Sequence, residues 1–307
     1  MDQIFFVGLL AAAFRLGTPI LFAALGETVA QRSGVLNVGI EGIMLVGAFT
    51  GVWGAFVSGS PWIGVLVAMV AGIAMAAVHV ILCLRLRLDQ IVAGIALTVF
   101  GLGLSGFGSR LLFPAGAVTR VPVFERVDFG ALSRIDIIGP AFFQHHALVY
   151  IGLALVLATW WFLTRTGWGL VISSVGEDPV AANAAGIDVI RTRAFCVLWG
   201  GALAGAGGAY LSVAQVGSFV EDMVAGRGFI AIACVVYGRW NPLGVLLATL
   251  FFGAADAGQI RLQPLFPGVP YQFFVMLPYV LAVGALVFLS RRSRLPAALA
   301  RAYTPPH

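Results

Sequence analysis

The chain has 307 residues, of which 60% are hydrophobic and only 10% are charged. Soluble globular domains carry about 25% charged residues, so this composition excludes an ordinary soluble domain and predicts an integral membrane protein. All 18 basic residues are arginines, scattered along the chain. That pattern excludes a basic nucleic-acid-binding surface, and the lack of lysine excludes a P-loop or a Schiff-base enzyme.

Apolar segments that could cross a bilayer recur along the whole chain. A helical span needs roughly 20 such residues. We expect eight to ten spans, placed near residues 4–26, 35–57, 62–84, 91–112, 147–164, 194–215, 228–239, 241–260 and 271–290. The seventh is short enough to be a half-span, and Pro242 predicts a tight turn after it. The predicted fold is all-α, with residues 1–307 forming one polytopic domain.

Two polar residues lie in the second expected span. Asn37 and Glu41 are four residues apart and would share one face of a helix. If that helix began near Val35, Glu41 would lie about 9 Å inside it. A carboxylate at that depth must be protonated, paired or facing water. Two interpretations stay open: a structural carboxylate bonded to backbone amides or to Arg32, and a residue of a translocation path.

Gln90 and Thr98 belong to the fourth expected span, where Gln90 opens the segment and Thr98 lines it. A second interpretation is that Asp89 and Gln90 only start the helix, since Asp is a good N-cap. Together with Asn37 and Glu41 they form the candidate translocation path. Glycines at close helical spacing, as in "GGALAGAGGAY" (200–210), predict tightly packed helices or a path whose walls move.

No arrangement of residues predicts catalysis or a metal site. Cys83, Cys196 and Cys234 lie far apart in or beside apolar segments, and His145 and His146 have no Cys or His partner nearby. We therefore expect a protein that is not an enzyme and that binds no metal or cofactor of its own.

Arginine placement predicts the orientation of the chain. Eleven arginines fall on the side of residues 173–193, six fall on the opposite side, and Arg15 lies within the first span. Residues 113–146 then form an extracytoplasmic loop, and the C-terminus is cytoplasmic. The expected location is the cell inner (plasma) membrane, and the last six residues are expected to be disordered.

Residues 173–193 are a polar stretch in an otherwise apolar chain. Asp178 is a good N-cap, Pro179 a good first helical residue and Gly186 a good stop signal. The helix between them would have about seven residues, too few to be stable alone. An ordinary interfacial turn is one interpretation. The other is a docking element for a soluble cytoplasmic partner.

This stretch resembles the coupling helix of permease subunits in ATP-binding cassette importers, through its "AAxxxG" core. The residues assigned to coupling on this resemblance are Glu177, Asp178, Pro179, Ala181, Ala182 and Gly186. Val180 stands where the motif has a leading Glu, and acidic residues lie slightly earlier. The resemblance implies that a separate ATPase subunit holds ATP and Mg and pushes on this helix.

The resemblance extends to residues 26–49, 89–105 and 226–253, which look like the simple-sugar and nucleoside members of the branched-chain amino acid/ribose permease family. They are closest to nucleoside systems of the basic-membrane-protein type. Thr98 stands where many such permeases have Asn. The resemblance implies a second, non-identical permease chain, an extracytoplasmic substrate-binding lipoprotein, and a nucleoside or simple sugar as cargo.

The main alternative is an ion-coupled secondary transporter using Glu41 and Asp256, the latter reaching interface water or pairing with Arg261. Inverted repeats with interrupted spans would favour that class, and the sequence shows no clear internal repeat. A membrane enzyme would need convergent catalytic groups. A purely structural scaffold would have no use for a docking helix.

Overall fold

The computed structural model describes residues 2–113, 121–130, 138–263 and 295–304, with scattered positions between 266 and 284. Within these residues the regular structure is helical, and seven helices are long and apolar enough to cross a membrane. The expected all-α polytopic fold is therefore confirmed. The ninth expected span, 271–290, lies largely outside the described residues.

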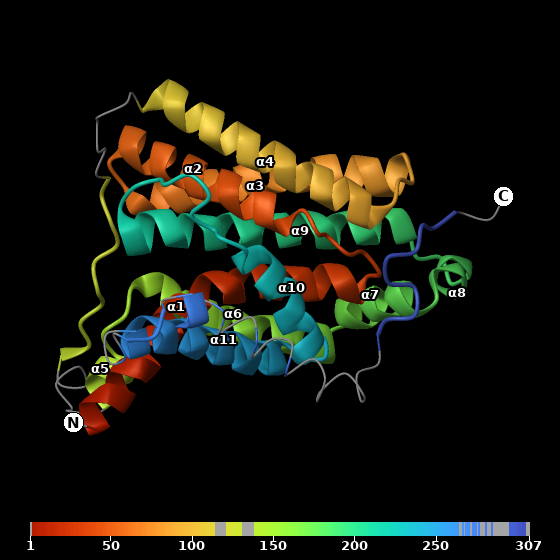
Figure 1. Cartoon of the computed structure of the whole chain (residues 1–307). Coiled ribbons are helices and arrows are strands. Elements are labelled where there is room, and N and C mark those ends of the chain that lie inside the picture. The colour runs from red at the N-terminus through yellow and green to blue at the C-terminus, as the bar shows by residue number, and fades with distance from the viewer. Residues whose placement is uncertain are drawn as a thin grey trace.

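The helices follow one another along the chain as labelled in Figure 1. Their bounds are α1 (Asp2–Arg32), α2 (Ile40–Ser58), α3 (Pro61–Val80), the π-helical η1 (Ile81–Arg85), α4 (Gln90–Leu112), α5 (Ile138–Phe142), α6 (Ala147–Arg165), α7 (Gly167–Glu177), α8 (Pro179–Ala184), α9 (Val189–Ala209), the π-helical η3 (Tyr210–Val216), α10 (Arg227–Tyr237) and α11 (Pro242–Leu262). The N-terminus and α5 lie at one end of the bundle, and α8 and the C-terminus lie at the other.

Helix α9 lies at the centre of the bundle. It packs against α1, α2 and α3, with α4 beyond them on one side and α6 and α11 on the other (Figure 1). Glycines allow this close approach. A Cβ added to Gly26 of α1 would lie 2.8 Å from Gly200 Cα of α9, and one added to Gly47 of α2 would lie 2.5 Å from the Gly205 carbonyl oxygen. The glycine-rich stretch therefore serves as a packing surface.

Two passages of the chain through the bundle, called crossings below, are only partly helical. Residues 33–39 run back from the α8 end before α2 begins at Ile40, and a non-helical stretch precedes α10 in the same way (Figure 1). The expected helix start near Val35 is wrong. The Asn37 side-chain oxygen accepts from the Gly39 N–H at 3.1 Å, a short-range bond that competes with helix formation. Asn37 and Glu41 therefore do not share a helix face.

Helix α10 confirms the half-span expected at 228–239. Its 11 residues reach about 16 Å, half the thickness of a bilayer core. The predicted turn before Pro242 is also confirmed, since the Asn241 side chain accepts from the Leu243 N–H at 3.0 Å and Pro242 is the first residue of α11. Pro in that position gives up no helical hydrogen bond.

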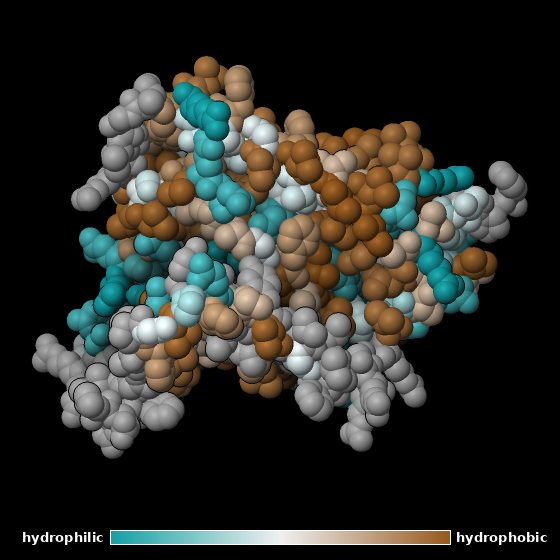
Figure 2. All heavy atoms as spheres, in the orientation of Figure 1, coloured by the Kyte–Doolittle hydropathy of each residue, from teal (hydrophilic) through white to brown (hydrophobic). Residues whose placement is uncertain are grey.

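Figure 2 shows how the surface follows this architecture. Hydrophobic atoms dominate the middle of the visible face, and hydrophilic atoms gather towards the two ends. This distribution fits a bundle whose middle faces lipid and whose ends face water.

Candidate functional site

Helix α8 begins and ends where the sequence predicts. The Asp178 carboxylate accepts from the Val180 and Ala181 N–H groups, both at 3.0 Å. Gly186 has φ +85°, a left-handed conformation that favours glycine, and its N–H donates to the Asn183 carbonyl at 2.9 Å. These contacts explain how six residues hold a helix that would be unstable alone.

Packing fixes α8 to the body of the protein. Its one buried side chain, Ala182, lies in a small apolar cluster with Val175 of α7 and Val189 of α9, and Tyr303 packs on the same cluster. The opposite face is open, and Val180 is 57% exposed. Helix α8 is thus a rigid projection with one exposed branched side chain at its tip.

Helix α7 carries this projection and was not anticipated from the sequence. Thr166 accepts from the Gly169 N–H at 3.3 Å to cap it. Ile172 and Val175 on its buried face are three residues apart, which is the helical signal in a stretch that otherwise looks like a polar loop. Gly176 lets α7 pack directly against the Arg32 carbonyl at the end of α1.

The C-terminal segment 295–304 ties this end of the bundle together. The Ala298 N–H donates to the Gly176 carbonyl at 2.9 Å, and the Ala300 N–H donates to the Gly34 carbonyl at 3.1 Å. The expectation of a disordered tail is therefore wrong for Tyr303, whose ring lies in the α8 cluster. The last three residues lie outside the described residues.

Arg193 of α9 also contacts the C-terminal segment at this end of the bundle. The residue was not singled out for this role in the sequence. It is almost fully buried. Its Nε donates to the Ser33 carbonyl at 3.0 Å and its Nη1 to the Arg301 carbonyl at 3.1 Å. A buried guanidinium is costly unless it is hydrogen-bonded, so these bonds fix the C-terminal segment and the start of the 33–39 crossing relative to each other.

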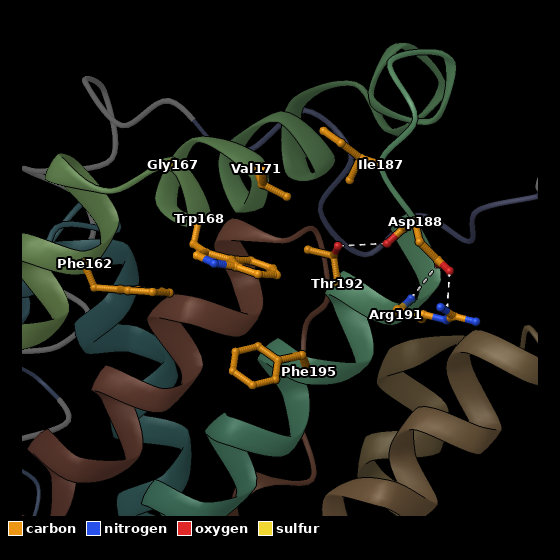
Figure 3. Close-up of a pocket in the computed structure, with 9 residues that line it drawn as sticks. All are labelled: Phe162, Gly167, Trp168, Val171, Ile187, Asp188, Arg191, Thr192 and Phe195. Atoms are coloured by element: carbon orange, nitrogen blue, oxygen red, sulfur yellow. Dashed lines mark hydrogen bonds and ion pairs between the residues drawn. The ribbon is translucent and has the colours of Figure 1, made fainter.

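A cavity of about 790 Å³ lies beside α7, between α6 and α9 (Figure 3). Aromatic side chains of Phe162, Trp168 and Phe195 form much of its wall. Its polar side chains have partners among its own lining residues. Arg191 forms an ion pair with Asp188 at 3.0 Å, and the Thr192 hydroxyl donates to the Asp188 carbonyl at 2.8 Å. The cavity therefore presents an apolar surface, which suits a hydrocarbon chain better than a polar solute.

The candidate path residues meet around the 33–39 crossing. The Gln90 side-chain oxygen accepts from the Leu36 N–H at 2.8 Å, and the Thr98 hydroxyl donates to the Val38 carbonyl at 3.4 Å. Non-helical backbone within a membrane must have its polar groups satisfied by protein or water. These side chains satisfy it, and their part in translocation stays a prediction.

A second layer of this network was missed in the sequence. Glu27 accepts from the Asn37 N–H at 3.0 Å and from the Gln31 amide at 3.0 Å. The Gln31 oxygen in turn accepts from the Trp240 indole N–H at 2.8 Å. The signal was the four-residue spacing of Glu27 and Gln31, which places both on one face of α1.

Glu41 connects the two interrupted crossings. As the second residue of α2 it accepts from the Gly226 N–H at 2.8 Å and from the Gly228 N–H at 2.6 Å, at the start of α10. These contacts match the interpretation of a structural carboxylate bonded to backbone amides. Nearby, Arg227 pairs with Asp256 at 3.5 Å, so the expected pairing of Asp256 with Arg261 is replaced by one with Arg227.

In the part of the chain that the structure describes, seven apolar spans, two interrupted crossings and one projection at the end of the bundle define a multi-pass membrane protein. Among the described residues, no group of three or more His, Cys, Asp or Glu could hold a metal ion.

Comparison with known proteins gives the family. The chain belongs to the family described as the permease component of the branched-chain amino acid transport system, which matches residues 9–286. NupQ of Bacillus subtilis, a guanosine ABC transporter permease protein, is 35% identical, with 91% of each chain covered. NupC of Lactococcus lactis, a nucleoside ABC transporter permease protein, is 34% identical, with 92% of each covered.

A third relative is TsgC13 of Haloferax volcanii, whose assignment as a glucose ABC transporter permease is provisional. It is 41% identical, with 85% of this chain and 79% of that protein covered. The chain is thus a non-catalytic permease subunit of an ABC transporter, a class that works with ATPase subunits and a binding protein.

Proposed function

We propose that this chain is one of two non-identical permease subunits of an importer for nucleosides or simple sugars, and that α8 docks the ATPase. The observation that carries the proposal is the capped, anchored α8 with an open face around Val180. Cargo class is inferred from the guanosine, nucleoside and glucose permeases that the chain resembles. The binding lipoprotein would dock at the opposite end of the bundle.

A continuous set of contacts would carry movement from α8 into the bundle. Tyr303 joins α8 to the C-terminal segment, Arg193 joins that segment to Ser33, and the 33–39 crossing leads to α2. Glu41 then joins α2 to α10. ATP and Mg on the partner ATPase would favour one of two packings of these elements, and so switch access between the membrane faces.

The test replaces the exposed tip of α8. Val180→Glu in the reconstituted importer places a charge in the proposed ATPase interface without touching the Ala182 cluster. We expect ATPase binding to weaken about tenfold or more and ATP-dependent uptake to fall with it. Val123→Glu is the control for ATPase binding alone, because Val123 is exposed and belongs to segment 121–130 at the opposite end of the bundle (Figure 1), where a charge could also affect uptake through the binding protein.

The same vesicles identify the cargo. Uptake of radiolabelled guanosine and of glucose, each with its binding protein and ATP, separates the two candidate classes. Full ATPase binding and full uptake in the Val180→Glu variant would refute the docking role of α8. Uptake that needs a proton or sodium gradient and no ATP would refute the importer itself.

A further inference from the structure

A second cavity, far from α8, is lined by positive charge. Its volume is about 180 Å³, and it lies between the first turns of α1, the end of α11 and the segment before α6. The side chains that line it include Arg15, Arg126, Arg261, His145 and His146. Sites that enclose a drug-sized molecule measure about 300–1,000 Å³, so this cavity fits a small ion or a single group of a larger molecule.

Two of the arginines at the cavity have no described counter-charge. Neither Arg15 nor Arg126 forms an ion pair with an acidic residue in the described part of the chain. None of the described residues that line the cavity is acidic. Arg15 and Arg126 are both exposed, so water partly screens their mutual repulsion, and an anion held between them would relieve what remains.

The two histidines at the cavity lie close to the positive charges of these arginines. Burial is the main cause that lowers the pKa of both histidines, and the positive charges of Arg15 and Arg126 add to it. Backbone hydrogen bonds, at Ala141 for His145 and at Glu125 and Phe124 for His146, oppose the shift. The buried Nδ1 of His146 has no hydrogen-bond partner among the described residues. The antiparallel bridge between Arg126 and His146 holds these groups side by side.

The depth of Arg15 suggests where the anion comes from. Arg15 lies 17 residues before Arg32 on the same helix, which is about 26 Å at 1.5 Å per residue. With Arg32 at one face of a hydrocarbon core of about 30 Å, Arg15 reaches the level of the opposite lipid phosphates.

We propose that the cavity lined by Arg15, Arg126 and His146 binds a phosphate group. Guanidinium groups match phosphate oxygens in pairs, and the cavity takes one such group. Nucleosides and simple sugars carry no charge, so this is not a cargo site. The phosphate is either the headgroup of a phospholipid or free inorganic phosphate, and the two sources differ in experiment.

The first arm uses the purified full chain in lipid-free detergent. Inorganic phosphate should raise the thermal unfolding midpoint saturably, relative to chloride at equal ionic strength. In Arg126→Gln and Arg15→Gln the apparent Kd should rise about tenfold or more. Arg126→Lys should give an intermediate Kd, because it keeps the charge and loses the paired contacts. Arg110→Gln is the control, because Arg110 is already paired with Glu221 at 2.8 Å and does not line the cavity.

The second arm adds phosphatidylglycerol and counts retained lipids by native mass spectrometry. A lipid headgroup is supported by two results together. Arg126→Gln retains one lipid fewer than Arg110→Gln, and the protein with lipid bound no longer responds to inorganic phosphate. A phosphate response without lipid retention supports the free ion. If neither arm separates Arg126→Gln from Arg110→Gln, the proposal fails. A third result would also overturn the proposal: Arg126→Gln weakens docking of the binding protein but changes neither the phosphate response nor lipid retention. These arginines would then bind a carboxylate of the binding protein.

Discussion

At Glu41, one carboxylate serves the start of two helices. It lies in the first turn of α2 and accepts two backbone N–H groups at the start of α10. Helix N-termini carry partial positive charge, so two of them meeting inside the bundle would repel without an anion between them. Glu41 supplies that anion.

This role predicts a stability effect. Glu41→Gln should lower the free energy of unfolding by about 1–3 kcal/mol, because one buried N–H loses its acceptor, and Glu41→Ala should cost roughly twice as much. Thermal unfolding in detergent measures both, with the exposed Glu125→Gln as control. A Glu41→Gln protein of full stability that no longer transports would favour the translocation interpretation.

Glycines in α9 predict a second contrast at single residues. A Cβ on Gly201 would lie 2.5 Å from the Gly72 carbonyl oxygen, whereas a Cβ on Gly103 of α4 would meet nothing within 4 Å. Gly201→Ala should therefore destabilise the protein by about 1–3 kcal/mol through overpacking. Gly103→Ala should be neutral or stabilise by up to about 1 kcal/mol. Equal unfolding midpoints for the two variants would show that α9 is packed less tightly than the structure indicates.

Among the elements, the C-terminal segment supports α8 in addition to α7 and α9. Tyr303 packs on the cluster of Ala182, Val175 and Val189. Earlier in the segment, two backbone N–H groups donate to the carbonyls of Gly176 and Gly34. Because the segment contacts both α8 and the 33–39 crossing, its loss should release α8 while leaving the spans in place.

Tyr303→Ala tests this coupling between elements. We expect hydrogen-exchange protection of residues 167–187 to fall roughly tenfold, as for a local loss of about 1.4 kcal/mol, and ATP-dependent uptake to fall with it. Protection in α9 and α11 should stay unchanged. The neighbouring exposed residue gives the control, Thr304→Ala. Unchanged protection in Tyr303→Ala would mean that α8 is held by α7 and α9 alone.

Element by element, the sequence predicted what short-range chemistry determines. Apolar length located the spans, and Asp178, Pro179 and Gly186 bounded α8, because capping and backbone preference act within a few residues. The break at 33–39 was missed although Gly34, Asn37 and Gly39 are local signals against a helix there. It depends on Gln90 and Glu27, which are distant in sequence. The order at Tyr303 depends on equally distant contacts.

For the whole molecule, the distribution of arginines predicts that α8 and the C-terminus face the cytoplasm. The structure places α8 and residues 121–130 at opposite ends of the bundle (Figure 1), so one label at each end determines the orientation. The chain suits such an experiment, because Cys83, Cys196 and Cys234 are all buried and should give little background.

Val180→Cys and Val123→Cys place one exposed thiol at each end. In sealed right-side-out vesicles, a membrane-impermeant maleimide should label Val123→Cys and leave Val180→Cys unmodified until the vesicles are opened. In inverted vesicles the pattern should reverse, and bound ATPase should protect Val180→Cys there. Labelling of Val180→Cys from outside would place α8 beyond the reach of any cytoplasmic ATPase. The chain could then still be a permease by family, but α8 could not be its coupling element.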